Sequence, residues 1–67
     1  MDNVDKCKLI CGGIEDEKNG QEYYRKLIKE FPHDKVALTP SLNDEIKHEK
    51  TLNIIKNGRL PDCSCEK

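Results

Sequence analysis

Residues 21–32 read QEYYRKLIKEFP, and this stretch carries the clearest structural signal in the 67-residue chain. Tyr24, Leu27, Ile28 and Phe31 follow one another at i, i+3, i+4 and i+7, the spacing that places side chains on one face of an α-helix. Pro32 predicts the end of this helix, because a residue that precedes proline avoids helical dihedral angles. We therefore expect a helix over about residues 22–31.

Two short apolar runs on either side of this helix are predicted to be strands. The first covers residues 6–11 and ends at Gly12 and Gly13, which suit a tight turn. The second covers residues 36–39, VALT, and is the kind of short apolar run that forms a buried strand. Pro40 is expected to break it.

A second helix is predicted over residues 42–57. Ser41 is a natural N-cap for it, and Gly58 is a suitable residue just beyond its end. The remaining tail is predicted to hold a third short strand near residues 60–65, which Pro61 would confine to the edge of the sheet.

This order of elements predicts an α/β fold, a small βαβα(β) domain with a short parallel sheet and two helices. Residues 1–67 are expected to form a single domain, with a mobile tail over about residues 61–67. The expected core consists of Leu9, Ile10, Leu27, Ile28, Phe31, Val36 and Leu38.

Composition limits what such a chain can do. Hydrophobic residues make up only 34% of it and charged residues 37%, so a disulfide, a metal or a partner is expected to supplement the small core. The net charge is −1 with no basic patch, which argues against nucleic-acid binding. The apolar runs are too short to cross a membrane, and the first residues lack the features of a signal peptide, which predicts a cytoplasmic location.

The four cysteines are the residues that point to specific chemistry. Cys11, Cys63 and Cys65 fall at the carboxyl ends of predicted strands, where parallel sheets place their ligands. We therefore expect these three to lie together and to bind a metal, either zinc or an iron–sulfur centre. Cys7 is expected to lie apart, because four residues of strand separate two Cα atoms by about 13 Å. It joins the group only if this segment is a turn or a helix.

Other interpretations of the cysteines stay open. They suit thiol–disulfide chemistry or a structural disulfide, and small buried cysteines can also be simple core residues. His33 and His48 lie in polar segments and are expected to be solvated, although either residue can bind a metal. No arrangement of catalytic residues can be inferred from spacing, so the chain is not expected to be a stand-alone enzyme.

Residues 12–39 resemble part of the C-terminal α/β domain of hybrid-cluster (prismane) proteins, relatives of carbon monoxide dehydrogenase. The shared features are a Gly-Gly pair, a helix with Tyr-aromatic-Arg, an x-Pro-x-Asp turn and an apolar strand, here Gly12-Gly13, Tyr23 to Arg25, Phe31 to Asp34 and Val36 to Thr39. The resemblance implies the fold and the sheet edge used for ligands. Ile14 stands where the family has a cysteine, and only Cys65 and a displaced Cys11 match cluster ligands, so a complete hybrid cluster and hydroxylamine-reductase activity are not implied.

Two classes of function follow. The first is a metal-binding, iron–sulfur or thiol-redox domain that acts through Cys11, Cys63 and Cys65. The second is a non-enzymatic protein–protein interaction module that uses an apolar surface around Ile46, Ile54 and Ile55. A secreted domain stapled by disulfides is a third option, and the sequence leaves the oligomeric state open.

Overall fold

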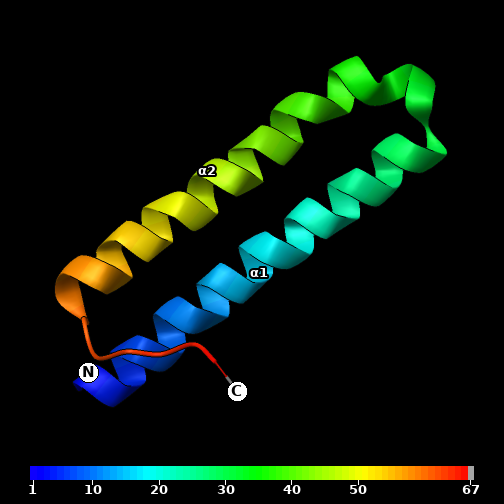
Figure 1. The fold of residues 1–67 in the computed structure, drawn as a ribbon. Helices are drawn as coiled ribbons and strands as arrows, with labels where there is room; N and C mark the ends of the chain where they lie inside the picture. Colours follow the sequence, from blue (N-terminus) through cyan, green and yellow to red (C-terminus); the bar gives the residue numbers. More distant parts are fainter. Residues whose placement is uncertain (67) are drawn as a thin grey trace.

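The structure, a computed structural model that describes residues 1–66, is a hairpin of two long helices (Figure 1). α1 spans Asn3–Glu30, a short 3₁₀ helix η1 spans Pro32–Asp34, and α2 spans Lys35–Arg59. Residues 60–66 form a tail that runs back over the first turns of α1 (Figure 1). The molecule is a rod of 46 × 20 × 17 Å.

Both helices owe their length to side chains that recur at alternating spacings of three and four residues. This spacing keeps one stripe of each helix against its partner, as in a two-stranded coiled coil. The stripe on α1 is at least partly buried throughout and consists of Cys7, Ile10, Ile14, Glu17, Gln21, Tyr24 and Ile28. The matching stripe on α2 consists of Leu38, Leu42, Glu45, Glu49, Leu52 and Lys56.

Local signals fix where the helices begin and end. The Asp2 side chain caps α1 by accepting a hydrogen bond from the backbone N–H of Asp5 at 2.8 Å. α1 ends at Glu30, directly before Phe31-Pro32, as the proline predicted. Pro40 does not break the chain. It lies inside α2, at the sixth helical residue, where its missing N–H removes a single helical hydrogen bond.

The predicted α/β fold with a parallel sheet is wrong. Residues 6–11 and 36–39, expected to be strands, are helical, and no strand forms anywhere in residues 1–66. Residues 60–65 are not a third strand. Helical structure over residues 22–30 and 42–57 is confirmed, but each segment is part of a longer helix.

The two helices approach closely at glycines of α1. A Cβ atom at Gly13 would lie 3.2 Å from the Leu52 side chain, and one at Gly20 would collide with the carboxylate of Glu45. Gly12 and Gly13 therefore do not form the expected turn. No glycine among the described residues has a positive φ, and Gly13 instead makes room for the partner helix.

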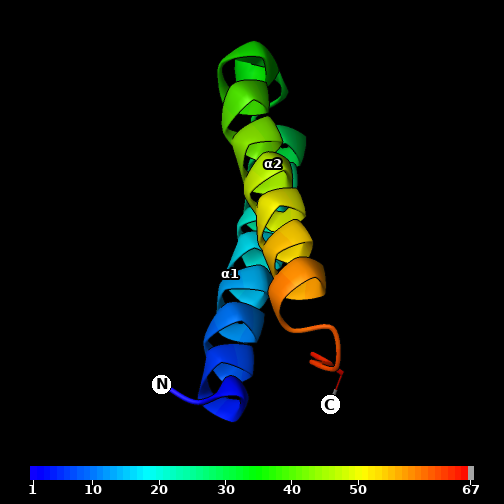
Figure 2. The same ribbon diagram turned by 90° about the vertical axis from the view of Figure 1, so that its left-hand side faces the viewer.

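A two-helix hairpin has only one seam in which to bury side chains. Figure 2 shows no further layer of the described chain over the outer faces of the helices. Ile14 is the one hydrophobic side chain in residues 1–66 that is buried, and Gln21 lies two turns farther along the same seam. The predicted core is wrong for Leu9, Phe31 and Val36, which are 67%, 55% and 87% exposed. The other expected core residues, Ile10, Leu27, Ile28 and Leu38, are partly buried.

Replacing Gly12 tests the helical assignment of this segment. No atom lies within 4 Å of the position that a Cβ atom would take at Gly12, so Gly12→Ala should stabilise α1 by about 1 kcal/mol. In a domain of this size the melting temperature should rise by about 4–8 °C, measured by circular dichroism.

Gly20→Ala is the matched control, because its methyl group would displace Glu45 from the seam and cancel the gain in helix propensity. A loss of stability in Gly12→Ala would show that this glycine forms a turn.

Candidate functional site

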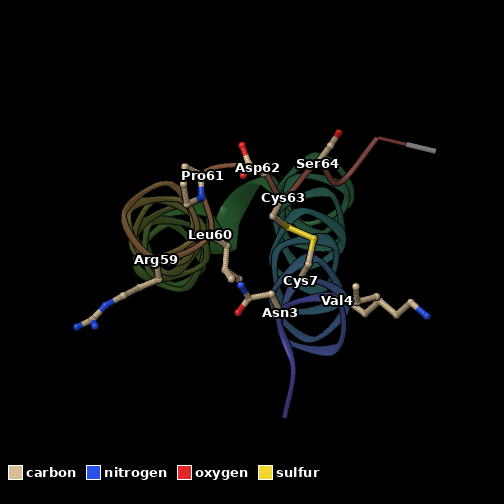
Figure 3. A pocket seen from close by; sticks show the side chains of 10 residues that line it. Asn3, Val4, Cys7, Arg59, Leu60, Pro61, Asp62, Cys63 and Ser64 are labelled. Carbon is tan, nitrogen blue, oxygen red and sulfur yellow. A yellow bond between two sulfur atoms is a disulfide. The ribbon is translucent and has the colours of Figure 1, made fainter.

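All four cysteines meet at the open end of the hairpin, the end opposite the connection between the two helices. Cys7 forms a disulfide with Cys63, and Cys11 forms one with Cys65. The Cα–Cα distances, 5.6 and 5.3 Å, lie within the range that disulfides allow. Figure 3 shows the Cys7–Cys63 bond between the tail and α1, with Leu60 directed into the space between the two helices.

The spacing of the two cysteine pairs matches the backbone that carries them. Cys7 and Cys11 lie four residues apart on one face of α1, a rise of about 6 Å. Cys63 and Cys65 lie two residues apart in the tail after α2, and an extended chain covers about 6.6 Å in two residues. The tail can therefore run alongside α1 in the same direction and form both bonds.

The two disulfides touch each other. The Sγ atoms of Cys11 and Cys63, which belong to different disulfides, lie 3.7 Å apart, and those of Cys7 and Cys11 lie 4.0 Å apart. Cys7, Cys11 and Cys63 are partly buried, whereas Cys65 is exposed. The site is therefore a compact cluster of four sulfurs with one side open to solvent.

One contact from α2 and one turn within the tail hold the tail against the hairpin. The Nζ atom of Lys56 donates a hydrogen bond to the backbone oxygen of Cys63 at 3.1 Å. The backbone N–H of Cys63 donates to the oxygen of Leu60 at 2.9 Å.

Lys8 and Lys18 line the hollow beside Cys65 together with one acid, Glu15.

The structure brings Cys11, Cys63 and Cys65 together, but the expectation that Cys7 lies apart is wrong. That expectation assumed an extended chain, and a helix places positions i and i+4 on one face. Metal ligation by Cys11, Cys63 and Cys65 stays a prediction. In the oxidised state seen here the sulfurs are not thiolates, the form that binds metal ions.

The resemblance to hybrid-cluster proteins finds no support in the fold. Residues 12–39 carry two helices and a tight connection where the family has strands, and the four cysteines pair with one another instead of offering ligands to an iron–sulfur centre. Comparison with protein-family models, with curated proteins and with solved structures found no match to this chain. No helix within residues 1–66 combines the length and the apolar character needed to cross a membrane.

A second group of polar residues lies in the middle of the seam, and sequence reasoning missed it. Ligand atoms of Glu17, Glu45 and His48 lie within 4.8 Å of one another, and His48 Nδ1 is 3.4 Å from Glu17 Oε2. The neighbouring Gln21 donates a hydrogen bond to Glu49 at 2.6 Å. The signal that could have revealed this group is the three-and-four spacing that places both glutamates of the cluster in the seam.

The electrostatics of this group are dominated by two facing carboxyl groups. Glu17 accepts a hydrogen bond from the protonated form of Glu45 and so raises the pKa of Glu45 above its usual range. Burial and the negative charges of Glu17 and Asp44 act in the same direction, while His48 opposes them. Folding therefore favours the protonated form of Glu45, and this contribution to stability is lost as the pH rises through the raised pKa.

Removing the cysteines in pairs tests how far the crosslinks hold the fold. Cys7–Cys63 joins residues 56 apart, and closing such a loop should stabilise the fold by about 4 kcal/mol. The second crosslink should add less, because its ends are already held together. The double variants Cys7→Ser/Cys63→Ser and Cys11→Ser/Cys65→Ser should therefore stay helical with lowered melting temperatures.

The variant with all four serines should lose much more, close to the whole stability expected of so small a domain. Thermal denaturation followed by circular dichroism measures all three. A four-serine protein that melts with the parent would show that the disulfides do not hold the hairpin closed.

Glu45→Gln tests the pH dependence. The amide is neutral at every pH and can still donate to Glu17, so the variant keeps the favourable contact that Glu45 loses on ionisation. The melting temperature of the variant relative to the parent should therefore rise as the pH increases above about 4.3, the usual pKa of a glutamate.

Glu22→Gln is the control, because Glu22 makes an exposed ion pair with Lys26, away from the seam. If both variants follow the parent across this pH range, Glu17 does not raise the pKa of Glu45.

Proposed function

We propose that this protein is a thiol-redox module, a helical hairpin whose open end is closed by two disulfides when oxidised and released when reduced. The contact between the two disulfides, with 3.7 Å between the Sγ atoms of Cys11 and Cys63, is the observation that supports this proposal best. Two crosslinks that served only to staple the chain would not need to touch.

The exposure of the cysteines suggests where reduction begins. Cys65 is the exposed member of the cluster, so a thiolate of an external dithiol can reach its sulfur first. Attack there forms a mixed disulfide with Cys65 and releases Cys11 as a thiolate. The second thiol of the reductant then displaces Cys65, so two electrons and two protons pass to the protein and the reductant becomes a disulfide.

The position of Cys11 suggests how the second disulfide follows. The freed Cys11 thiolate lies close to Cys63 and can attack it, forming a Cys11–Cys63 disulfide and releasing Cys7. This exchange conserves electrons and leaves a single disulfide, Cys11–Cys63, which a second dithiol reduces. Lys8 and Lys18 line the approach to Cys65 and attract an anionic thiolate.

The compartment determines which state persists. Disulfides are stable in oxidising environments, and in a reducing cytosol they are usually transient and catalytic or sensory. A redox function therefore accommodates the predicted cytoplasmic location, which a purely structural pair of disulfides would not. A protein partner is the second candidate function, and it is favoured by the exposure of Ile46, Ile54 and Ile55, at 41%, 64% and 46%.

Equilibration with thiol–disulfide buffers, followed by alkylation and intact mass, tests the redox proposal. Structural disulfides typically have reduction potentials below about −300 mV, so the proposal expects a midpoint above that value. A midpoint far below it would identify the cysteines as staples and favour the interaction module.

Reduction kinetics test the relay through Cys11. In Cys11→Ser/Cys65→Ser the remaining Cys7–Cys63 disulfide should be reduced more slowly by a dithiol than in the parent. In Cys7→Ser/Cys63→Ser, the matched control, reduction of Cys11–Cys65 should keep its rate. Equal rates for Cys7–Cys63 with and without Cys11 would contradict the relay.

A further inference from the structure

We infer that the reduced form of the sulfur cluster is a tetrathiolate site for a zinc-type divalent cation, with Cys7, Cys11, Cys63 and Cys65 as its ligands. This inference rests on the proposed redox function, because the four sulfurs are free to bind a metal only after reduction. The oxidised protein is then crosslinked by two disulfides, and the reduced protein is closed by a bound metal ion.

Distances between the sulfurs support the site. Zinc–thiolate bonds are about 2.3 Å long, so the sulfurs of a tetrahedral site lie about 3.8 Å apart. The separations of Cys11 from Cys63 and of Cys7 from Cys11, at 3.7 and 4.0 Å, already fit this value. Sγ atoms of Cys7, Cys11 and Cys63 all lie within 4.8 Å of one another.

Cys65 must approach Cys7 and Cys63 to complete the site, because its Sγ atom is not among the three that lie within 4.8 Å of one another. The two bonded pairs must also move apart when the disulfides are reduced. Each must open from bonding distance to about 3.8 Å, a change of roughly 2 Å. Cys7 and Cys11 are fixed on a helix, whereas Cys63 and Cys65 belong to a tail that forms no regular structure over residues 63–66. The tail can therefore supply the movement without disturbing α1.

Charge around the cluster also suits such a site. A zinc ion with four thiolates carries two negative charges. The hollows beside the cysteines are lined by four bases, Lys8, Lys18, Lys56 and Arg59, against three acids, Glu15, Asp62 and Glu66. The surroundings therefore carry an excess of positive charge that offsets the charge of the occupied site.

Metal binding would also restore the link between the tail and α1 that reduction of the disulfides breaks. The seam buries one hydrophobic side chain in the described chain, so a reduced hairpin without a metal has little to hold its open end closed. One ion bound by four sulfurs closes the same loops as the two disulfides, and its binding energy becomes folding energy.

The exchange between the two forms balances. Four cysteine thiols and one Zn²⁺ give the tetrathiolate and release four protons. Two molecules of a small disulfide, such as oxidised glutathione, then accept four electrons, leaving two protein disulfides, a free Zn²⁺ and four small thiolates. Oxidation therefore releases the metal.

Cobalt titration of the full chain, reduced without oxygen and freed of metal, tests the inference. One Co²⁺ per chain should bind with the thiolate-to-cobalt absorption and the intense visible bands of a tetrahedral sulfur site. Zn²⁺ should displace it, and helix content should rise on binding if the reduced chain has partly unfolded. Cys7→Ser should weaken Co²⁺ binding more than the roughly 10–100-fold typical of losing a residue outside the ligand shell.

Two controls distinguish binding at the sulfur cluster from binding elsewhere in the protein. Glu17→Gln alters the other group able to hold a cation and should leave the sulfur bands unchanged. The oxidised protein should show no such bands. If reduced protein gives no thiolate-to-cobalt absorption at saturating Co²⁺, the metal site is excluded, while the midpoint measured in metal-free thiol buffers still decides the redox function independently.

Discussion

The paired disulfides between the tail and α1 are the constraint on which the rest of the structure depends. Two antiparallel helices share one seam, and a chain of this length buries too little apolar surface to be stable by packing alone. Here Ile14 is the one buried hydrophobic side chain in residues 1–66. The crosslinks offset this shortage mainly by restricting the unfolded chain, because they join positions more than fifty residues apart.

The composition of the seam between the helices explains why both disulfides lie at one end of the hairpin. The turn from Phe31 to Asp34 already joins the helices at the other end, and the middle of the seam is polar. Gln21 pairs with Glu49 and His48 with Glu17 across it. These contacts favour one register, since a shift of either helix would leave the groups without partners. The disulfides lie at the end opposite this turn, where the tail runs beside the first turns of α1 (Figure 1) and where the chain termini would otherwise separate.

The sequence predicted some helices and missed the fold for identifiable reasons. The apolar stripe from Tyr24 to Phe31 was enough to identify a helix. Farther toward the N-terminus the same stripe continues through Glu17 and Gln21, whose polar side chains hide it from a hydrophobicity pattern. Leu9 and Ile10 then resembled a short strand, and the glycines after them resembled a turn. Pro40 similarly resembled a strand breaker, although α2 accommodates it near its start.

The cysteine site was predicted from a parallel sheet that the structure does not contain in residues 1–66. Cys11, Cys63 and Cys65 were expected together at the edge of a sheet, and they do meet, but across the end of a helical hairpin. Cys7 was excluded by a distance that holds only for an extended chain. The match between two helical cysteines four residues apart and two tail cysteines two residues apart becomes visible only once the helix is known.

Disulfide mapping of the unreduced protein by trypsin digestion and mass spectrometry shows whether the tail is bonded to α1. Trypsin cuts after Lys8, between the two cysteines of α1, and after Arg59, before the tail. We expect one complex of three peptides, in which the segments that carry Cys7 and Cys11 are both bonded to residues 60–67. A Cys7 peptide bonded to a Cys11 peptide, with residues 60–67 released separately, would show local pairing and would contradict the closed hairpin.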